Sequence, residues 1–91
     1  MTEFTRQVLD VVDGIPLGSV MTYGEVAERV GVRAPRAVGA VLARHGGEVA
    51  WHRVVYADGR LPPGHEAESG RRLRAEGVQV RGDRVDLRVG P

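Results

Sequence analysis

Two stretches in the first third of the chain have the periodicity of amphipathic helices. Between Thr2 and about Asp13, apolar residues recur every three or four positions, as on the buried face of a helix. A second helix is expected to begin after Thr22, because Glu25 stands three residues later and completes a capping box. Gly31 then provides its stop. The apolar positions of the first helix are Phe4, Val8, Val11, Val12 and Ile15.

A third helix is predicted from Pro35, which suits the first helical position, to a stop at Gly46. Two short helices joined by a tight turn form a helix-turn-helix. One side of the third helix carries the core residues Val38, Val41 and Leu42, whereas the other side carries one arginine and small residues. These are Arg36, Gly39, Ala40 and Ala43. So bare a face allows close approach of DNA or of another part of the chain, and Arg36 favours DNA.

The second half of the chain contains shorter signals. Residues 52–56, HRVVY, predict a strand that turns at 57–59 and returns through 60–61. A fourth helix is expected over 65–77. Alternation of apolar and polar residues over 78–89 predicts a terminal hairpin.

Taken together, these elements predict a mainly α fold with a small β hairpin, a winged-helix-like domain that contains a helix-turn-helix. A chain of 91 residues accommodates a single domain, residues 1–91, with a modest core. No apolar run approaches the ~20 residues that cross a bilayer, and the N-terminus lacks the apolar segment of a signal peptide. We therefore expect a cytoplasmic protein with no membrane partner.

The absence of cysteine excludes a disulfide framework, a thiolate zinc site and a cysteine nucleophile from these 91 residues. The sequence gives no sign of a metal or an organic cofactor. Residues 1–28 hold one Arg and five acidic residues, a net charge of −4. Residues 29–60 hold six Arg and two acidic residues, a net charge of +4. Residues 61–91 hold six Arg and five acidic residues, a net charge of +1. The basic middle third favours an anionic partner, although a solvated surface has the same composition.

The only tryptophan, Trp51, precedes His52, Arg53 and two valines. A flat aromatic beside an imidazole and a guanidinium is compatible with core packing and also with a binding site for a flat ligand. Tyr23 stands at the first position of the second helix, where packing with an exposed hydroxyl and a functional role are both open.

Four motifs in order are similar to those of a known family: TYGEVA at 22–27, PRAVGAVLA at 35–43, WHRVV at 51–55 and GRLPPGHEAE at 59–68. The sequence resembles the alkyltransferase-like proteins, relatives of the C-terminal, DNA-binding domain of O6-alkylguanine-DNA alkyltransferases. The resemblance extends over about residues 4–80, most of the chain.

The resemblance aligns Trp51 with the cysteine that accepts the alkyl group in the alkyltransferases. That reaction requires a thiolate activated by a neighbouring base. An indole nitrogen is a hydrogen-bond donor and cannot take this part. The resemblance therefore implies a protein that retains the DNA-reading residues and is not an enzyme.

The resemblance also implies roles for residues of the helix-turn-helix. Tyr23 matches the tyrosine that crowds the phosphate beside the target nucleotide and helps to rotate it out of the stack. Arg36 matches the arginine finger that fills the gap left in the duplex. Ala34, Ala37 and Gly39 match small residues of a recognition helix that enters the minor groove, where close approach requires a bare face.

The remaining matches surround Trp51. His52 and Glu76 match the histidine and carboxylate that relay a proton to the cysteine, and without a thiol we expect them to be a structural remnant. Val54 matches a residue whose backbone contacts the flipped base. The implied lesion pocket consists of Tyr23, Trp51, His52, Arg53 and Val54.

Some positions depart from the family pattern. Ala50 stands where proline is usual, the segment leading to Trp51 is shorter, and the hinge beside the recognition helix has no asparagine. Some relatives have a basic residue that can lie over the modified base in the loop after GRL. Here that loop continues as 62–65, PPGH, with Arg60 and His65 as the nearest candidates.

We therefore expect a non-catalytic DNA damage sensor, monomeric and associated with the nucleoid. It would bind O6-alkylguanine in duplex DNA by minor-groove helix insertion and nucleotide flipping. Family resemblance adds nucleotide excision repair proteins as partners, for which the sensor marks the lesion. The alternative is a winged-helix DNA-binding regulator without a lesion pocket, which leaves the Trp51 stretch unexplained. A working alkyltransferase would need an acceptor other than cysteine.

Overall fold

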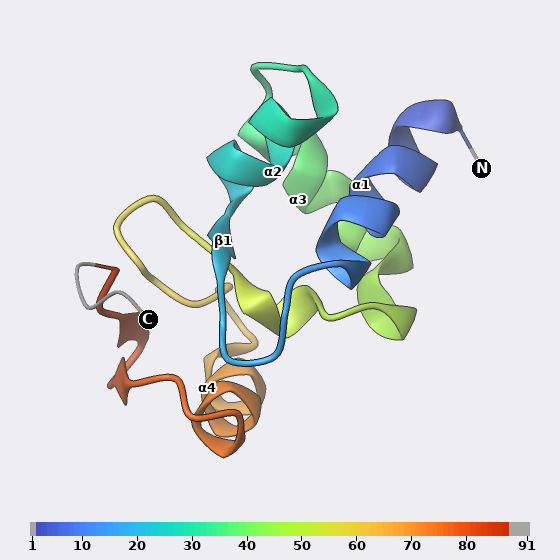
Figure 1. The fold of residues 1–91 in the computed structure, drawn as a ribbon. Helices are drawn as coiled ribbons and strands as arrows, with labels where there is room; N and C mark the ends of the chain where they lie inside the picture. Colours follow the sequence, from blue (N-terminus) through green and yellow to red (C-terminus); the bar gives the residue numbers. More distant parts are fainter. Residues whose placement is uncertain (1, 88–91) are drawn as a thin grey trace.

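The computed structural model describes residues 2–87. Three helices pack together in the N-terminal half, and the fourth lies apart from them (Figure 1). The helices are α1 (Glu3–Asp13), α2 (Tyr23–Val30), α3 (Pro35–His45) and α4 (Glu66–Ala75), with two 3-10 helices, η1 (Gly46–Glu48) and η2 (Trp51–Arg53). The strands are β1 (Met21–Thr22), β2 (Val54–Val55), β3 (Val80–Arg81) and β4 (Arg84–Val85). The predicted mainly α fold with a small β hairpin is confirmed.

The predicted starts of α2 and α3 are confirmed, the first by a capping box and the second by Pro35 at the first helical position. The Thr22 hydroxyl accepts a hydrogen bond from the Glu25 backbone N–H at 3.0 Å, and the Glu25 carboxylate accepts one from the Thr22 N–H at 2.8 Å. Gly31 ends α2 in the left-handed conformation, with φ of 92°. α3 begins at Pro35 and forms the predicted helix-turn-helix with α2.

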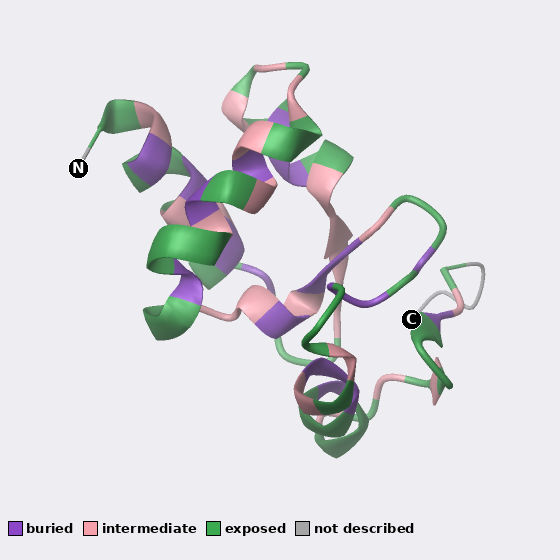
Figure 2. Cartoon of the chain, turned by 180° about the vertical axis from the view of Figure 1, so that it is seen from behind, coloured by how far each residue is buried: buried purple, intermediate pink, exposed green. Residues whose placement is uncertain are grey.

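A core of aliphatic side chains joins α1, α2 and α3. Figure 2 marks the buried positions of these helices in purple. Burial of each large aliphatic side chain stabilises the fold by about 1.5–3 kcal/mol. Phe4 and Val11, which were predicted for the core face of α1, are half-buried at its edge. The buried members include Val8, Val12, Ile15, Val26, Val38 and Val54.

The hairpin predicted over residues 52–61 is confirmed only in part: the chain turns at 57–59, where the Tyr56 N–H donates to the Arg60 carbonyl at 2.9 Å, but β2 does not pair with residues 60–61. Residues 51–53 instead form η2, and β2 pairs in parallel with β1, with Met21 opposite Val54 and Thr22 opposite Val55. The two valines are fully buried, so neither face of β2 is available to solvent as in an exposed hairpin. A parallel pair needs a long crossover, and α2 with α3 provides it.

A second, smaller core lies around α4. Its buried residues are Val55, Leu61, Leu73 and Val85. Gly70 lies on the face of α4 that packs on this core, since a Cβ there would lie 3.5 Å from the Leu61 side chain and 3.7 Å from that of Val80. The helix is shorter than the predicted 65–77.

The terminal hairpin is present but short. β3 and β4 pair antiparallel, and Arg60 forms an isolated bridge to Arg84, so the chain after the turn at 57–59 joins this hairpin and not β2. The last part of the predicted hairpin, residues 88–89, lies outside the described residues.

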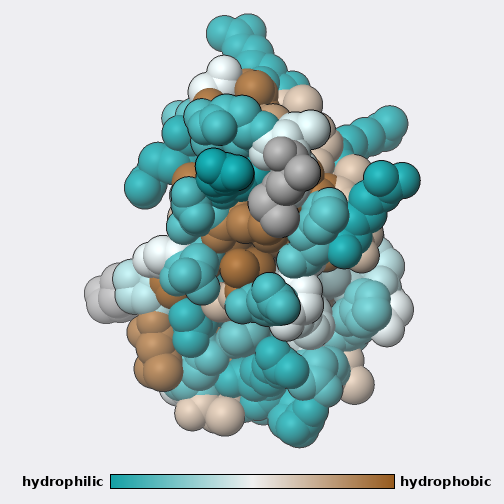
Figure 3. All heavy atoms as spheres, turned by 90° about the vertical axis from the view of Figure 1, so that its right-hand side faces the viewer, coloured by the Kyte–Doolittle hydropathy of each residue, from teal (hydrophilic) through white to brown (hydrophobic). Residues whose placement is uncertain are grey.

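The surface on the side of α1 is mostly hydrophilic, with a small apolar area near its middle (Figure 3). Among the large apolar side chains of residues 2–87, Leu17 is the most exposed, at 70%. No helix in this part of the chain is long and apolar enough to cross a membrane.

Leu73→Ala should lower the free energy of unfolding by about 2–5 kcal/mol, because it leaves a cavity in the smaller core. Leu17→Ala is the matched control and should change it by less than about 0.5 kcal/mol. Urea denaturation followed by circular dichroism measures both. Equal losses in the two variants would contradict the assignment of the second core.

Candidate functional site

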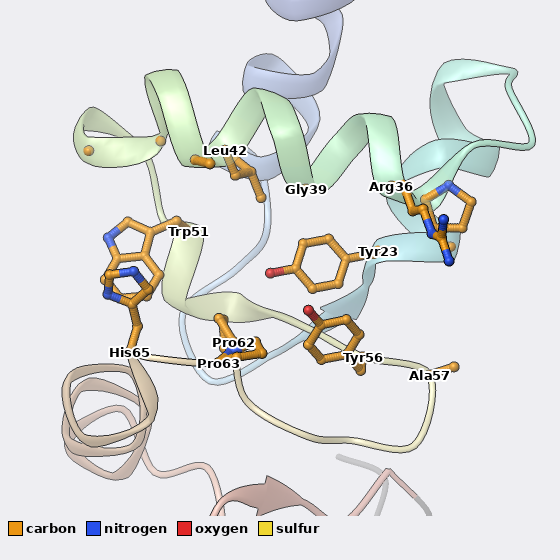
Figure 4. A pocket seen from close by; sticks show the side chains of 15 residues that line it. Tyr23, Arg36, Gly39, Leu42, Trp51, Tyr56, Ala57, Pro62, Pro63 and His65 are labelled. Atoms are coloured by element: carbon orange, nitrogen blue, oxygen red, sulfur yellow. The ribbon is translucent and has the colours of Figure 1, made fainter.

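A cavity of about 760 Å³ opens between α3 and the loop that follows β2 (Figure 4). Helix α3 forms one side and Pro62 and Pro63 form the opposite side. Two tyrosines, Tyr23 and Tyr56, stand across the cavity from Trp51, so residues from four separate segments enclose it. A cavity of this size with mostly apolar walls and a few polar groups is typical of a binding site for a small organic group.

The bare side of α3 borders this cavity. Arg36, Gly39 and Ala43 line it at spacings of three and four residues, as positions on one helical face do. A Cβ on Gly39 would lie 3.9 Å from the Tyr23 ring, so a larger side chain there would extend into the space beside the ring. Leu42, predicted for the core, is half-buried and lines the cavity as well. Gly39 and Ala43 therefore border the cavity, whereas Ala40 is exposed and is not among the cavity-lining residues.

The ring centroids of Tyr23 and Tyr56 are 5.0 Å apart, with the rings tilted by 47°. Burial, and secondarily the nearby Tyr56 hydroxyl, raises the pKa of Tyr23 to about 12. Tyr23 therefore keeps its proton at neutral pH and can donate a hydrogen bond.

Trp51 is half-buried and forms part of the cavity wall. The His65 ring meets the indole edge-on at 5.6 Å between centroids, and the Arg72 guanidinium carbon lies 5.6 Å from the ring centre. Edge-to-face and cation–π contacts of this kind hold an aromatic ring in one orientation. The tryptophan is thus held in place by neighbours outside the three-helix core.

Arg36 lies at the end of the cavity beyond Tyr23 (Figure 4). Its side chain is exposed, and it forms no ion pair within residues 2–87. A free cation at the mouth of an apolar cavity can attract an anionic partner.

The two residues of the predicted remnant relay, His52 and Glu76, lie in contact, and Arg53 joins them. His52 Nε2 is 2.7 Å from one Glu76 carboxylate oxygen, and Arg53 donates two hydrogen bonds to the same carboxylate at 2.9 and 3.0 Å. Arg53 also donates to the Ile15 carbonyl at 2.8 Å. Hydrogen bonds from Arg53 first, and then from His52, lower the pKa of Glu76 to about 2. This cluster ties the segment after α1 to η2 and to the end of α4.

The predicted site residues fall into two groups in space. Tyr23, Arg36, Gly39 and Trp51 line the cavity. Ala34 and Ala37 are half-buried at the start of α3 and are not among the cavity-lining residues. The structure does not bring His52, Arg53 and Val54 to the wall: the first two contact Glu76, and Val54 is buried in the core.

Tyr56 was not predicted for the site. It lines the cavity only because β2 pairs with β1, a contact that no periodicity in the sequence indicates. The one available signal was its rarity, since it is one of only four aromatic residues.

Of the two loop residues considered for a contact with the modified base, His65 lines the cavity, whereas Arg60 lies over the Tyr56 ring. No group of three or more acidic or histidine side chains within residues 2–87 could hold a metal ion.

Residues 3–78 match the family model for the DNA-binding domain of 6-O-methylguanine DNA methyltransferase. The chain belongs to this family. It is 43% identical over 90 residues to the DNA base-flipping protein of Escherichia coli, covering 92% of this chain and 70% of that protein. It is 38% identical over 87 residues to alkyltransferase-like protein 1 of Schizosaccharomyces pombe, covering 88% and 81%.

Solved structures of the family have the same fold. The structure of S. pombe Atl1 in complex with damaged DNA containing O6-carboxymethylguanine superposes with a TM-score of 0.86 at 34% identity, covering 97% of this chain and 93% of that one. The O6-methylguanine methyltransferase of Mycobacterium tuberculosis gives 0.69 at 29% identity, covering 91% of this chain and 53% of that enzyme.

Family membership makes the missing cysteine decisive for catalysis. Several relatives are named methylated-DNA–protein-cysteine methyltransferases, whereas this chain has no cysteine to serve as acceptor. These residues therefore lack the nucleophile of cysteine alkyl transfer, which agrees with the prediction of a non-catalytic member of the family.

Glu76→Gln should lower the free energy of unfolding at pH 7 by on the order of 2 kcal/mol, because a neutral amide loses the charge-assisted bonds from Arg53. The depressed pKa means that this stabilisation is complete above the ordinary value of 4.5 and is lost as pH falls toward 2. The difference in free energy of unfolding between wild type and Glu76→Gln should therefore become smaller as pH falls from about 5 to about 2. Exposed Glu28→Gln is the control. A difference in free energy of unfolding that does not change with pH would contradict the stabilising role of the ionised Glu76 carboxylate.

Proposed function

We propose that this protein is a non-catalytic sensor of O6-alkylguanine in duplex DNA. It rotates the modified nucleotide out of the stack and holds the base in the cavity between Trp51 and the two tyrosines. The relatives named for base flipping, and the relative solved with O6-carboxymethylguanine DNA, support the choice of ligand.

The observation that carries the proposal is the placement of Trp51 across an apolar cavity from Tyr23, with Arg36 at its mouth. A flat aromatic wall can contact the face of a base, and base–aromatic stacking contributes about 1–3 kcal/mol. Flipping costs a few kcal/mol and least for a poorly paired base, so an O6-alkylated guanine is favoured over guanine. The cavity therefore selects lesions through their weaker pairing as well as by contact.

The helix-turn-helix supplies the rest of the mechanism. The small residues of α3 allow its backbone to approach a minor groove, and Arg36 then fills the space that the rotated nucleotide leaves. Other arginines of the basic middle third add phosphate contacts that weaken with salt and do not depend on sequence. The bound, bent site then marks the lesion for nucleotide excision repair proteins.

The competing function is a winged-helix regulator without a lesion pocket. It accounts for the helix-turn-helix but gives no role to a cavity lined by Trp51, Tyr23 and Tyr56. The two functions differ in one measurable respect, because only the sensor distinguishes a damaged duplex from an undamaged one.

Trp51 is the only tryptophan, so its fluorescence reports on the cavity without a label. Titration with otherwise identical duplexes, with and without one O6-methylguanine, should show tighter binding and stronger quenching for the damaged duplex. Both affinities should fall as salt rises. Equal affinity and equal quenching for the two duplexes would refute the sensor and favour the regulator. Alkylation of the protein, detected by mass spectrometry, would restore the enzyme hypothesis.

Arg36→Ala should weaken binding to the damaged duplex at least about tenfold, which corresponds to about 1.4 kcal/mol, because the gap in the stack is no longer filled. Arg6→Ala removes the same charge from the exposed side of α1 and serves as the control. It should weaken binding to both duplexes slightly and equally. Equal effects of the two substitutions on lesion preference would contradict the role of Arg36.

A further inference from the structure

Tyr56 follows β2 directly, as Tyr23 follows β1. Because Thr22 pairs with Val55 in a parallel register, the next residue of each strand emerges beside the other. The two rings accordingly lie 5.0 Å apart on one side of the cavity. The position of Tyr56 is therefore built into the fold and does not depend on a loose loop.

Both tyrosine hydroxyls point toward the interior of the cavity, on the side opposite Trp51 (Figure 4). Neither has a hydrogen-bond partner among residues 2–87. The raised pKa of Tyr23 keeps its hydroxyl protonated. Two hydroxyls that can each donate and accept thus face the same apolar space.

The Tyr56 ring is held from its other side as well. The Arg60 guanidinium carbon lies 5.2 Å from the ring centre, and Asp58 holds Arg60 by an ion pair of 2.9 Å and a backbone hydrogen bond of 3.0 Å. A ring fixed between a second tyrosine and a cation loses little conformational freedom when a ligand arrives. Tyr56 is therefore preorganised to contact an occupant of the cavity.

We propose that Tyr56 is a second base-reading residue, whose hydroxyl forms a hydrogen bond to a ring nitrogen of the purine held in the cavity. This inference rests on the proposed function. Alkylation at O6 removes the proton from N1, so both N1 and N3 of the modified base are acceptors that a hydroxyl can satisfy. In unmodified guanine N1 carries a proton, so one of these acceptors is lost. N3 is an acceptor in both bases, so a contact at N3 gains its selectivity from flipping, which favours the poorly paired alkylated base. At either nitrogen the Tyr56 hydroxyl therefore adds affinity mainly for the damaged duplex.

Tyr56→Phe tests the inference, because it removes the hydroxyl and keeps the ring that packs on Tyr23. The affinities of wild type and variant are measured by anisotropy of labelled duplexes with O6-methylguanine or guanine at one position. We expect binding to the damaged duplex to weaken about three- to tenfold, as for loss of one hydrogen bond, and binding to the undamaged duplex to change less than about twofold. Thermal unfolding is compared first to verify that the fold is retained.

A change in the DNA gives a second test, whose first arm uses only the wild-type protein. Wild type is titrated with duplexes in which the O6-methylguanine carries CH in place of N1 or of N3. One of the two replacements should weaken wild-type binding by the same three- to tenfold factor, and Tyr56→Phe should add no further loss on that duplex.

The outcomes separate this inference from the proposed function. Equal wild-type affinity for damaged and undamaged DNA would overturn both. A wild-type lesion preference that Tyr56→Phe leaves unchanged, or a loss equal on both duplexes, would overturn only the role of Tyr56. Insensitivity of wild-type binding to both ring-nitrogen replacements would overturn it as well.

Discussion

A parallel pairing of only two residues on each strand fixes the geometry of the whole site. Met21–Thr22 pairs with Val54–Val55, which places Tyr23 beside Tyr56 and sets Trp51 one short helix before the pair. Two residues of ladder are not stable alone. Here Val54 is buried in the three-helix core and Val55 in the smaller core around α4. Both cores therefore hold β2, and this fixes the position of Tyr56, the next residue.

The cluster of Arg53, His52 and Glu76 supports the same segment from the other side. It joins η2 to the end of α4 and, through the Ile15 carbonyl, to the segment after α1. In an alkyltransferase-like chain without a thiol, these residues have no nucleophile to activate. Their geometry shows what they still do: they anchor the short helix that carries Trp51. The cluster thus supports the cavity on the side of Trp51.

Local chemistry made much of the fold predictable. The capping box of α2, the proline that starts α3 and the glycines that end both helices act within a few residues, so the sequence alone indicates them. The bare face of α3 likewise indicated an approach surface, and Arg36 and Gly39 do line the cavity. The parallel pairing joins residues 33 positions apart and leaves no periodic signal. For this reason the partner of the strand at 54–55 was predicted incorrectly and Tyr56 was missed. For the same reason His52, Arg53 and Val54 were expected at a cavity wall that they do not line.

The central claim is that binding turns the modified nucleotide out of the duplex. A 2-aminopurine placed next to O6-methylguanine measures this directly, because its fluorescence rises when its stacking neighbour leaves. Addition of the protein should raise the emission strongly for the damaged duplex and little for the same duplex with guanine. Tight, lesion-selective binding with no rise in 2-aminopurine emission would contradict the account.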